Sequence, residues 1–261
     1  MSLSIPTESY LNASEHQFNL SFSEVLLLRD YCRTNGTFFC SSMGGCESIR
    51  DLQESKYLGA DAVEFPFIES LFSFSKIFTA LEKVFSDEKN IFLDYKVFIN
   101  IGSFKGIDFL LNLEDFKLPE FIKRRNIIFT FDRIKLARDK FKIKTSKVNL
   151  INYESEINKN ISEAISKLNY LQFSNCISGG INVKSLKGLY EMPFNKTQFI
   201  KTGLFTIKIN QLTFDKLVKC VQISQGTEAK LLNLMNDTLN KKIDYLNERI
   251  LSINDDIYES L

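Results

Sequence analysis

The stretch from Ser41 to Ser70 narrows the choice of folds more than any other part of the sequence. Its Gly44-Gly45 pair predicts a tight turn after a strand, and Ser48 to Tyr57 has the composition of a helix. Gly59 predicts the end of that helix, and the apolar run Ala62 to Phe67 predicts a strand buried on both faces. The stretch therefore indicates a βαβ unit with parallel strands, whose chemistry gathers in loops at the C-terminal ends of strands.

The same alternation of strand and helix continues along the chain, with no break rich in Pro, Gly or Ser. About eight repeats over residues 1–211 predict an α/β fold, a single TIM (β/α)8 barrel, and an open doubly wound sheet is the alternative. The predicted strands cover Leu3–Thr7, Thr37–Ser41, Ala62–Phe67, Tyr95–Ile101, Asn126–Phe131, Lys147–Ile151, Leu171–Ile177 and one strand within Gln198–Ile209.

Residues 212–261 form a different region, for which the pattern predicts helix only. Apolar residues recur there at spacings of four and three, which is typical of one helix face: Leu239, Ile243, Leu246, Ile250 and Ile253. A barrel closes without so long a C-terminal extension. We expect the apolar face to pack either on the barrel itself or on a neighbouring subunit.

Composition excludes some classes of protein. The net charge of +1 argues against nucleic acid as a partner, because phosphate binding normally requires a basic excess. The five cysteines show no regular pairing, which favours a reduced, cytoplasmic protein. The N-terminal residues do not resemble a signal peptide, and no apolar run is long enough to span a membrane.

Several acidic residues follow predicted strands and are therefore candidates for catalysis. Glu47 lies in the glycine turn, Glu64 lies within a buried apolar run, and Asp132 ends a later strand. A buried carboxylate such as Glu64 needs a partner or a shifted pKa, so it belongs either to a site or to a pair with a lysine. The only histidine, His16, falls in a polar stretch, which disfavours a serine-type triad.

Two glycine turns provide candidate substrate-binding residues. The first comprises Ser42, Gly44 and Gly45, and the second comprises Ser178, Gly179 and Gly180. Free backbone amides at such a turn can hold a phosphate or a carboxylate, and the alternative is an ordinary connection between strand and helix. Cys46 begins a helix, where a thiolate would be favoured, although a small buried cysteine is the simpler interpretation.

Residues 41–70, SSMGGCESIRDLQESKYLGADAVEFPFIES, resemble the GGCE-x-IRD … LG-D … P-IES stretch of aldolases of the HpcH/HpaI and citrate-lyase type. Shorter likenesses occur at Ile5–Glu8, Lys96–Ile101, Ile127–Asp132 and Ser178–Asn182. The resemblance implies a barrel that cleaves or forms a carbon–carbon bond beside a 2-oxo acid or an aldehyde-type ligand. It also implies a divalent cation, Mg or Mn, held by a glutamate and an aspartate and polarising the 2-oxo group.

The sequence departs from that family at the metal site. Asp132 matches the metal aspartate, whereas the position of the metal glutamate is Gly102, which has no side chain to offer. The family's Gly-Arg-x-Asp arginine falls on Thr130, its lysine before GGCE falls on Ser42, and its late Glu-Thr-Arg element reads Lys201-Thr202-Gly203. Asp132 is then the one remaining metal ligand, and three other carboxylates are alternative ligands: Glu47, Glu64 and Glu69.

Three functions follow from these patterns. The first is an aldolase or lyase of 2-oxo acids whose site is rebuilt around Asp132. The second is a barrel without catalysis that acts as a partner or regulatory subunit, in a homo-oligomer or beside an active paralogue. The third is a barrel that binds a small molecule through apolar contacts, for which Phe104, Phe129 and Phe131 are the candidates. Fold alone does not separate them.

Overall fold

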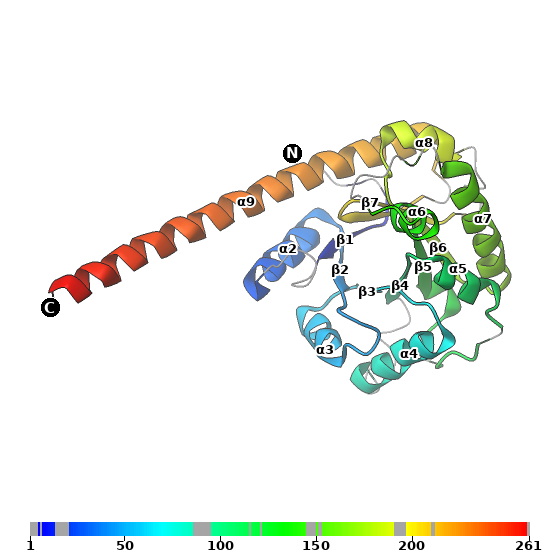
Figure 1. Ribbon diagram of the computed structural model, residues 1–261, viewed down its shortest axis with the longest axis horizontal. Helices are drawn as coiled ribbons and strands as arrows, with labels where there is room; N and C mark the ends of the chain where they lie inside the picture. Colours follow the sequence, from blue (N-terminus) through cyan, green and yellow to red (C-terminus); the bar gives the residue numbers. More distant parts are fainter. Residues whose placement is uncertain are drawn as a thin grey trace.

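A computed structural model of the chain contains a closed barrel of eight strands surrounded by helices (Figure 1). It describes residues 5, 7–13, 21–85, 95–114, 116–120, 122–144, 150, 153–190, 197–209 and 212–259. The strands are β1 (Ser9–Ala13), β2 (Phe38–Ser42), β3 (Ala62–Phe65), β4 (Lys96–Ile101), β5 (Ile127–Asp132), β6 (Ser174–Ser178), β7 (Phe199–Thr202) and β8 (Phe205–Lys208).

Helices follow the strands and cover the outside of the barrel (Figure 1). Within the described residues they are α2 (Phe22–Asn35), α3 (Ile49–Leu58), α4 (Leu71–Phe85), α5 (Phe104–Leu111), α6 (Arg133–Phe141), α7 (Glu154–Tyr170), α8 (Val183–Tyr190) and α9 (Phe214–Glu259), with a short 3-10 turn, η3, at Arg124–Asn126. Helix α3 ends at Gly59, as the sequence predicts. No described helix combines the length and the apolar character that crossing a bilayer would require.

The order of the strands confirms the predicted TIM-barrel class, and the closed sheet rules out the open alternative. Neighbouring strands from β1 to β7 pair in parallel, each with the next along the chain. Strand β8 differs, because it runs antiparallel to both β7 and β1 and closes the barrel between them. Only Gly203 and Leu204 separate Thr202 from its partner Phe205, which is a hairpin loop too short for a crossover helix.

Three of the predicted strands differ from the sequence-based ranges or cannot be compared with them. The region Gln198–Ile209 contains two antiparallel strands in place of the single predicted one, because the Gly203 turn reverses the chain. The first strand begins later than predicted: Ile5, Thr7 and Glu8 form no strand, and β1 begins at Ser9, in a segment predicted to be loop. The predicted strand at Lys147–Ile151 lies outside the described residues except for one position in 3-10 conformation, Leu150.

Successive residues of each strand point alternately to the helices and to the barrel interior, and they contribute to two separate apolar clusters. Those facing the helices are almost all apolar and join the main core, as Val97, Ile99 and Ile101 of β4 do. Those facing the barrel interior form a small separate apolar layer, with one residue from each strand from β1 to β7: Tyr10, Cys40, Ala62, Phe98, Ile128, Cys176 and Phe199. Such layers of side chains fill the interior of TIM barrels, so this barrel is packed rather than hollow.

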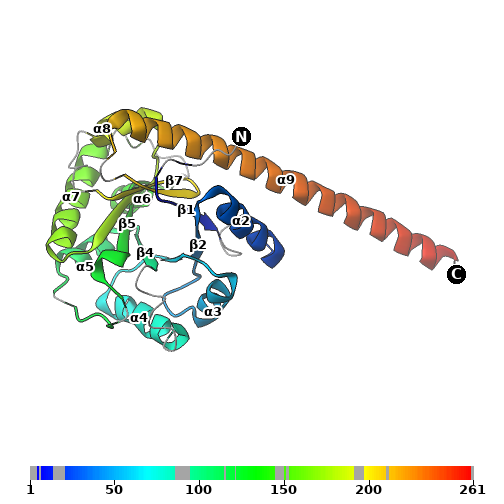
Figure 2. The same ribbon diagram turned by 180° about the vertical axis from the view of Figure 1, so that it is seen from behind.

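The C-terminal extension consists of one helix, α9, whose 46 residues correspond to a length of about 69 Å. Its first half packs on the barrel through Leu217, Val221 and Leu231, and Ser224 Oγ lies 2.8 Å from Thr202 Oγ1 of β7. Figures 1 and 2 show the rest of α9 projecting well beyond the barrel. The side chains of the predicted apolar face, from Leu239 to Ile253, lie outside the described part of the structure.

Candidate active site

A polar cavity of about 780 Å³ opens at the end of the barrel where the parallel strands finish. Its lining includes Ser42, Asp132 and Ser178, which are the last residues of β2, β5 and β6. Glu64 of β3, Asn100 of β4 and Lys201 of β7 complete the part of the wall contributed by strands. This end of a TIM barrel is where catalytic residues from several strands meet, so the cavity is the candidate active site.

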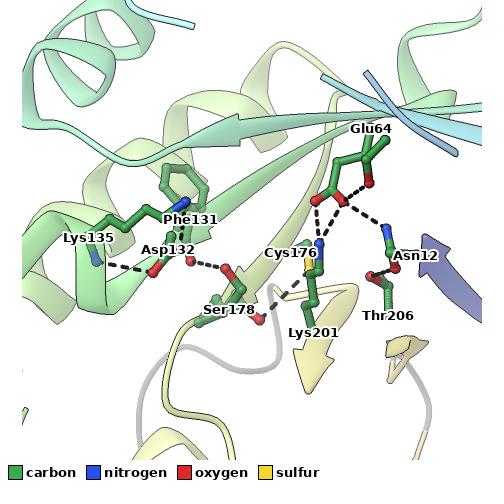
Figure 3. A network of polar contacts seen from close by, with 11 residues as sticks. Asn12, Glu64, Phe131, Asp132, Lys135, Cys176, Ser178, Lys201 and Thr206 are labelled. Carbon is green, nitrogen blue, oxygen red and sulfur yellow. Dashed lines mark hydrogen bonds and ion pairs between the residues drawn. The ribbon is translucent and has the colours of Figure 1, made fainter. Parts of the chain in front are cut away.

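The central feature of the cavity is a buried ion pair between Glu64 and Lys201 (Figure 3). Lys201 Nζ lies 2.5 Å from Glu64 Oε1 and 2.7 Å from Glu64 Oε2, so the ammonium group contacts both oxygens. The side chains are only 4% exposed for Glu64 and 14% exposed for Lys201. The residual exposure of Lys201 is on the cavity side, because it is one of the lining residues.

Neutral side chains complete the coordination of the Glu64 carboxylate. Asn12 Nδ2 donates to Glu64 Oε2 at 3.0 Å, Ser42 Oγ donates to the same oxygen at 3.3 Å, and Asn100 donates a further hydrogen bond. Thr206 Oγ1 in turn donates to Asn12 Oδ1 at 3.0 Å, which fixes the orientation of the Asn12 amide (Figure 3). These donors come from β1, β2, β4 and β8, so the barrel as a whole positions this carboxylate.

The ion pair lies next to the buried apolar layer of the barrel. Cys40 and Cys176 of this layer are fully buried and close enough to Glu64 and Lys201 to feel their charges. Burial raises the pKa of the Cys176 thiol to about 12 and raises the pKa of Cys40 well above its usual range. Both thiols therefore stay neutral, and Lys201 and Glu64 are the charged groups next to them.

The pair keeps both of its members charged. Burial alone would raise the pKa of Glu64, but the charge of Lys201 and the hydrogen bonds outweigh it, and the pKa lies below its ordinary value. Burial alone would lower the pKa of Lys201, but Glu64 outweighs that effect and raises the pKa above its ordinary value. The resting site is therefore an ammonium–carboxylate pair.

This pKa shift predicts an acid-dependent loss of stability. Because the folded-state pKa of Glu64 lies below its unfolded value, the carboxylate stabilises the fold fully above the unfolded value. We expect this contribution to disappear as the pH falls through the folded pKa. Urea unfolding between pH 7 and pH 3 should show a shallower fall in stability for Glu64→Gln than for the wild type. Parallel curves for the two proteins would contradict the assignment.

A second pair, Asp132 and Lys135, lies on the cavity wall at the start of α6 (Figure 3). Asp132 Oδ1 accepts a hydrogen bond from the backbone N–H of Lys135 at 3.1 Å, and Asp132 Oδ2 lies 3.7 Å from Lys135 Nζ. The carboxylate thus caps its helix. A Cβ at Gly179, whose φ is +80°, would lie 2.6 Å from Asp132 Oδ1, so only glycine allows the β6–α8 turn to approach so closely.

The residues present do not fit the divalent cation that the sequence resemblance implies. Gly102 follows Ile101, whose strand partner is Phe131, so it lies beside Asp132, as the resemblance implies, but provides no ligand. The carboxylate of Glu64 is occupied by Lys201, and that of Asp132 caps α6. Among the described residues, no cluster of three or more His, Cys, Asp or Glu side chains is arranged to hold a metal. Mg²⁺ or Mn²⁺ would have to displace a lysine from its carboxylate.

Most of the residues singled out in the sequence line the cavity, whereas Gly45, Glu47 and Glu69 do not. Seven of them are lining residues: Ser42, Gly44, Glu64, Asp132, Ser178, Gly179 and Gly180. Gly45 and Glu47 are not among the described lining residues, and Glu47 instead forms an exposed ion pair with Lys76 at 2.7 Å. Glu69 bonds to Ser103 Oγ beside a different depression. His16 lies outside the described residues.

The aromatic residues proposed for an apolar binding site face away from the cavity. Phe129 packs against Phe74 and Phe173 in the core between barrel and helices, with ring centroids 5.7 and 5.4 Å apart. Phe131 belongs to the same core, and the ring of Phe104 lies under Lys140. For Phe129 and Phe131 the reason is the two-residue period of a strand, which turns Thr130 inward and its neighbours outward, whereas Phe104 belongs to helix α5. These three residues therefore do not support the third hypothesis.

The sequence interpretation missed Lys201, Asn12 and Asn100 as members of the site. Lys201 appears in the sequence as a single charge within the apolar segment Phe199–Phe205, in the same way that Glu64 interrupts its own strand. Two isolated opposite charges in buried strands are a signal that they pair with each other. Asn12 gave no such signal, because its segment resembles a polar loop.

Sequence comparisons find no relative, whereas comparison of the structure finds many. No model of a known protein family matches the chain, and no curated protein matches it significantly. Among solved structures, 78 chains match in fold. They include the citrate synthase SbnG, with a TM-score of 0.53 and 9% identity over 85% of this chain and 83% of that chain.

Two other structures of similar fold carry related names. An HpcH/HpaI aldolase/citrate lyase family protein from Burkholderia cenocepacia has a TM-score of 0.53 and 10% identity over 73% of this chain and 77% of that chain. A malate synthase from Haloferax volcanii has a TM-score of 0.52 and 10% identity over 82% of this chain and 64% of that chain. The family that residues 41–70 resemble is thus represented among structures with this fold, and at this identity the likeness shows the fold alone.

Proposed function

We propose that this barrel is an aldolase-type lyase that acts on a small 2-oxo acid or aldehyde without a divalent cation. The observation that carries the proposal is the buried Glu64–Lys201 pair at the base of the cavity. Cleaving a carbon–carbon bond beside a carbonyl group requires one group that moves protons and one that stabilises the electrons left behind. A largely buried carboxylate and ammonium provide both.

The cavity also offers groups that suit the carboxylate of a 2-oxo acid. Lys135 contributes a positive charge on the cavity wall and is 48% exposed, so it can turn toward a ligand. Gly179 and Gly180 also line the cavity, and the backbone amides of such a glycine turn are candidates to bind a carboxylate. With the carboxylate held there, the carbonyl group would point toward Lys201, whose positive charge stabilises the negative charge that develops on the oxygen. Glu64 would accept the proton.

Names of proteins with this fold are consistent with the proposal. They include a citrate synthase, an HpcH/HpaI aldolase/citrate lyase family protein and a malate synthase. The short sequence likeness in residues 41–70 points to the same class. Because the donor set here does not suit a divalent cation, the activity we propose depends on Lys201 and Glu64 instead.

Isotope exchange tests this function with a minimal substrate, because it requires only the 2-oxo acid half of the reaction. We expect the purified protein to catalyse exchange of the C3 hydrogens of pyruvate or 2-oxobutyrate with solvent deuterium, followed by proton NMR. Glu64→Gln should lower the rate by about 10²–10⁴-fold, the usual contribution of a positioned base. Treatment with EDTA should leave the rate unchanged.

The control for this experiment is Glu156→Gln, which removes an exposed carboxylate of α7 that pairs with Lys140. Its exchange rate should equal that of the wild type. An absence of exchange by the wild-type protein with both 2-oxo acids would contradict the proposal and favour the second function, a barrel that serves as a partner or regulatory subunit.

The proposal includes a cytoplasmic location, which the five free cysteines would suit, and an oligomeric state, which the long helix α9 would suit.

A further inference from the structure

Lys201 is the one described lysine that is both nearly buried and open to the cavity. Its Nζ is held within 2.5–2.7 Å of the two oxygens of Glu64, and the remaining exposed part of its side chain lines the cavity. By contrast Lys135 is half-exposed on the rim, and Lys208 pairs with Glu8 at 2.6 Å without lining the cavity. An amine at the base of this cavity, within hydrogen-bond distance of a carboxylate that can take its proton, has the arrangement of nucleophile and base that covalent catalysis requires.

We propose that Lys201 Nζ forms an imine with the carbonyl carbon of the bound 2-oxo acid or aldehyde, and that Glu64 transfers the protons this requires. The inference rests on the proposed function and replaces purely electrostatic stabilisation by a covalent intermediate. The neighbouring nucleophiles are weaker candidates, since Cys40 and Cys176 are fully buried thiols below the cavity.

The step balances without any further reactant. Glu64 takes a proton from the Lys201 ammonium, and the neutral amine attacks the carbonyl carbon, so that a carbon–nitrogen bond forms. Glu64 returns this proton to the carbonyl oxygen and then carries a second proton from the nitrogen to the same oxygen. The carbon–oxygen bond breaks, and the oxygen leaves as water. The products are one water molecule and a protonated imine on Lys201. No electrons are gained or lost, and the step requires no oxidant or reductant.

The surroundings of Glu64 suit the product as well as the resting state. A protonated imine carries the same positive charge as the ammonium that it replaces, so the buried carboxylate keeps its counter-ion throughout. Asn12, Ser42 and Asn100 hold the carboxylate in place by hydrogen bonds that do not involve Lys201. Glu64 is then positioned to remove the proton beside the imine carbon, and the cationic nitrogen accepts the electrons that this releases.

Borohydride trapping tests the inference. The protein is incubated with pyruvate or glyoxylate, sodium borohydride is added, and the intact mass and a peptide map are measured. Hydride addition converts the protonated imine into a stable secondary amine. We expect one ligand per chain, located on the peptide that contains Lys201. Lys201→Arg should lose the label, and Lys208→Arg should retain it, because Lys208 is a lysine of another lysine–glutamate pair in the barrel. Label spread over surface lysines would overturn the inference.

Measuring isotope exchange on the same samples separates the inference from the function on which it rests. Exchange together with label on Lys201 supports both. Exchange without label overturns the imine and leaves the lyase function in place. Label without exchange supports the imine and contradicts the lyase function, and the absence of both contradicts both. The peptide map of the wild-type protein locates the label even where Lys201→Arg does not fold.

Discussion

Replacing Lys201 by methionine is expected to lower the free energy of unfolding by about 3–5 kcal/mol. The substitution removes the counter-ion of Glu64 but leaves its carboxylate buried, with a side chain only 4% exposed. Such a group must either stay charged in an apolar environment or take up a proton, and both cost free energy. Urea denaturation at pH 7, monitored by circular dichroism, measures the loss.

A double variant provides the matched control for this result. Lys201→Met combined with Glu64→Gln removes both charges and keeps an acceptor for the hydrogen bond of Asn12. Because replacing both members of a buried pair is often close to neutral, we expect the double variant to recover most of the stability lost in Lys201→Met. If the double variant is instead as unstable as the sum of the single variants, the two side chains are not coupled, and the pair is not the organising interaction of the site.

Replacing Phe74 by alanine is expected to cost about 3–5 kcal/mol through loss of packing. Phe74 of α4 is fully buried at the centre of an aromatic cluster that joins the helices to the outer face of β5. Its ring centroid lies 5.0 to 6.4 Å from those of five partners: Phe78, Phe109, Phe116, Phe129 and Phe173. Alanine would leave a cavity that these rigid rings cannot fill.

The same helix supplies the control. Phe72 lies two residues earlier and is 69% exposed, so Phe72→Ala should change the free energy of unfolding by no more than about 0.5 kcal/mol. Thermal and urea unfolding of the two variants distinguish a core contribution from a general effect of removing a phenyl ring from α4. Equal losses in the two variants would show that the aromatic cluster does not form as described.

The sequence predicted strand positions well where the buried residues are mostly apolar. It predicted them poorly where polar residues face the barrel interior. Strand β5 is largely apolar and buried, and its predicted range, Asn126–Phe131, differs from the observed one by a single residue at each end. Strand β1 begins later than predicted because two of its inward positions are Tyr10 and Asn12, so its residues resemble a loop. Asn12 is acceptable at its position because the fold brings it to Glu64, 52 positions along the chain, whereas the partner of Tyr10 is the neighbouring Glu8.

The site was predictable in location but not in chemistry. Strand ends and glycine turns placed Ser42, Asp132 and Ser178 at one end of the barrel, and all three line the cavity. The pairing of Glu64 with Lys201 joins residues 137 positions apart, which no local spacing expresses. The sequence analysis treated Lys201-Thr202-Gly203 only as a departure from the family's Glu-Thr-Arg element. It therefore did not recognise that the Lys201 ammonium group pairs with the buried Glu64 carboxylate.

The length of α9 affects how the size of this protein should be measured. A compact chain of 261 residues has a radius of gyration of about 18 Å, whereas this helix alone corresponds to about 69 Å. A particle with such an arm diffuses more slowly than a sphere of equal mass, and gel filtration would assign it too large a mass. Subunit stoichiometry should therefore come from light scattering or sedimentation equilibrium, which weigh the particle irrespective of its shape.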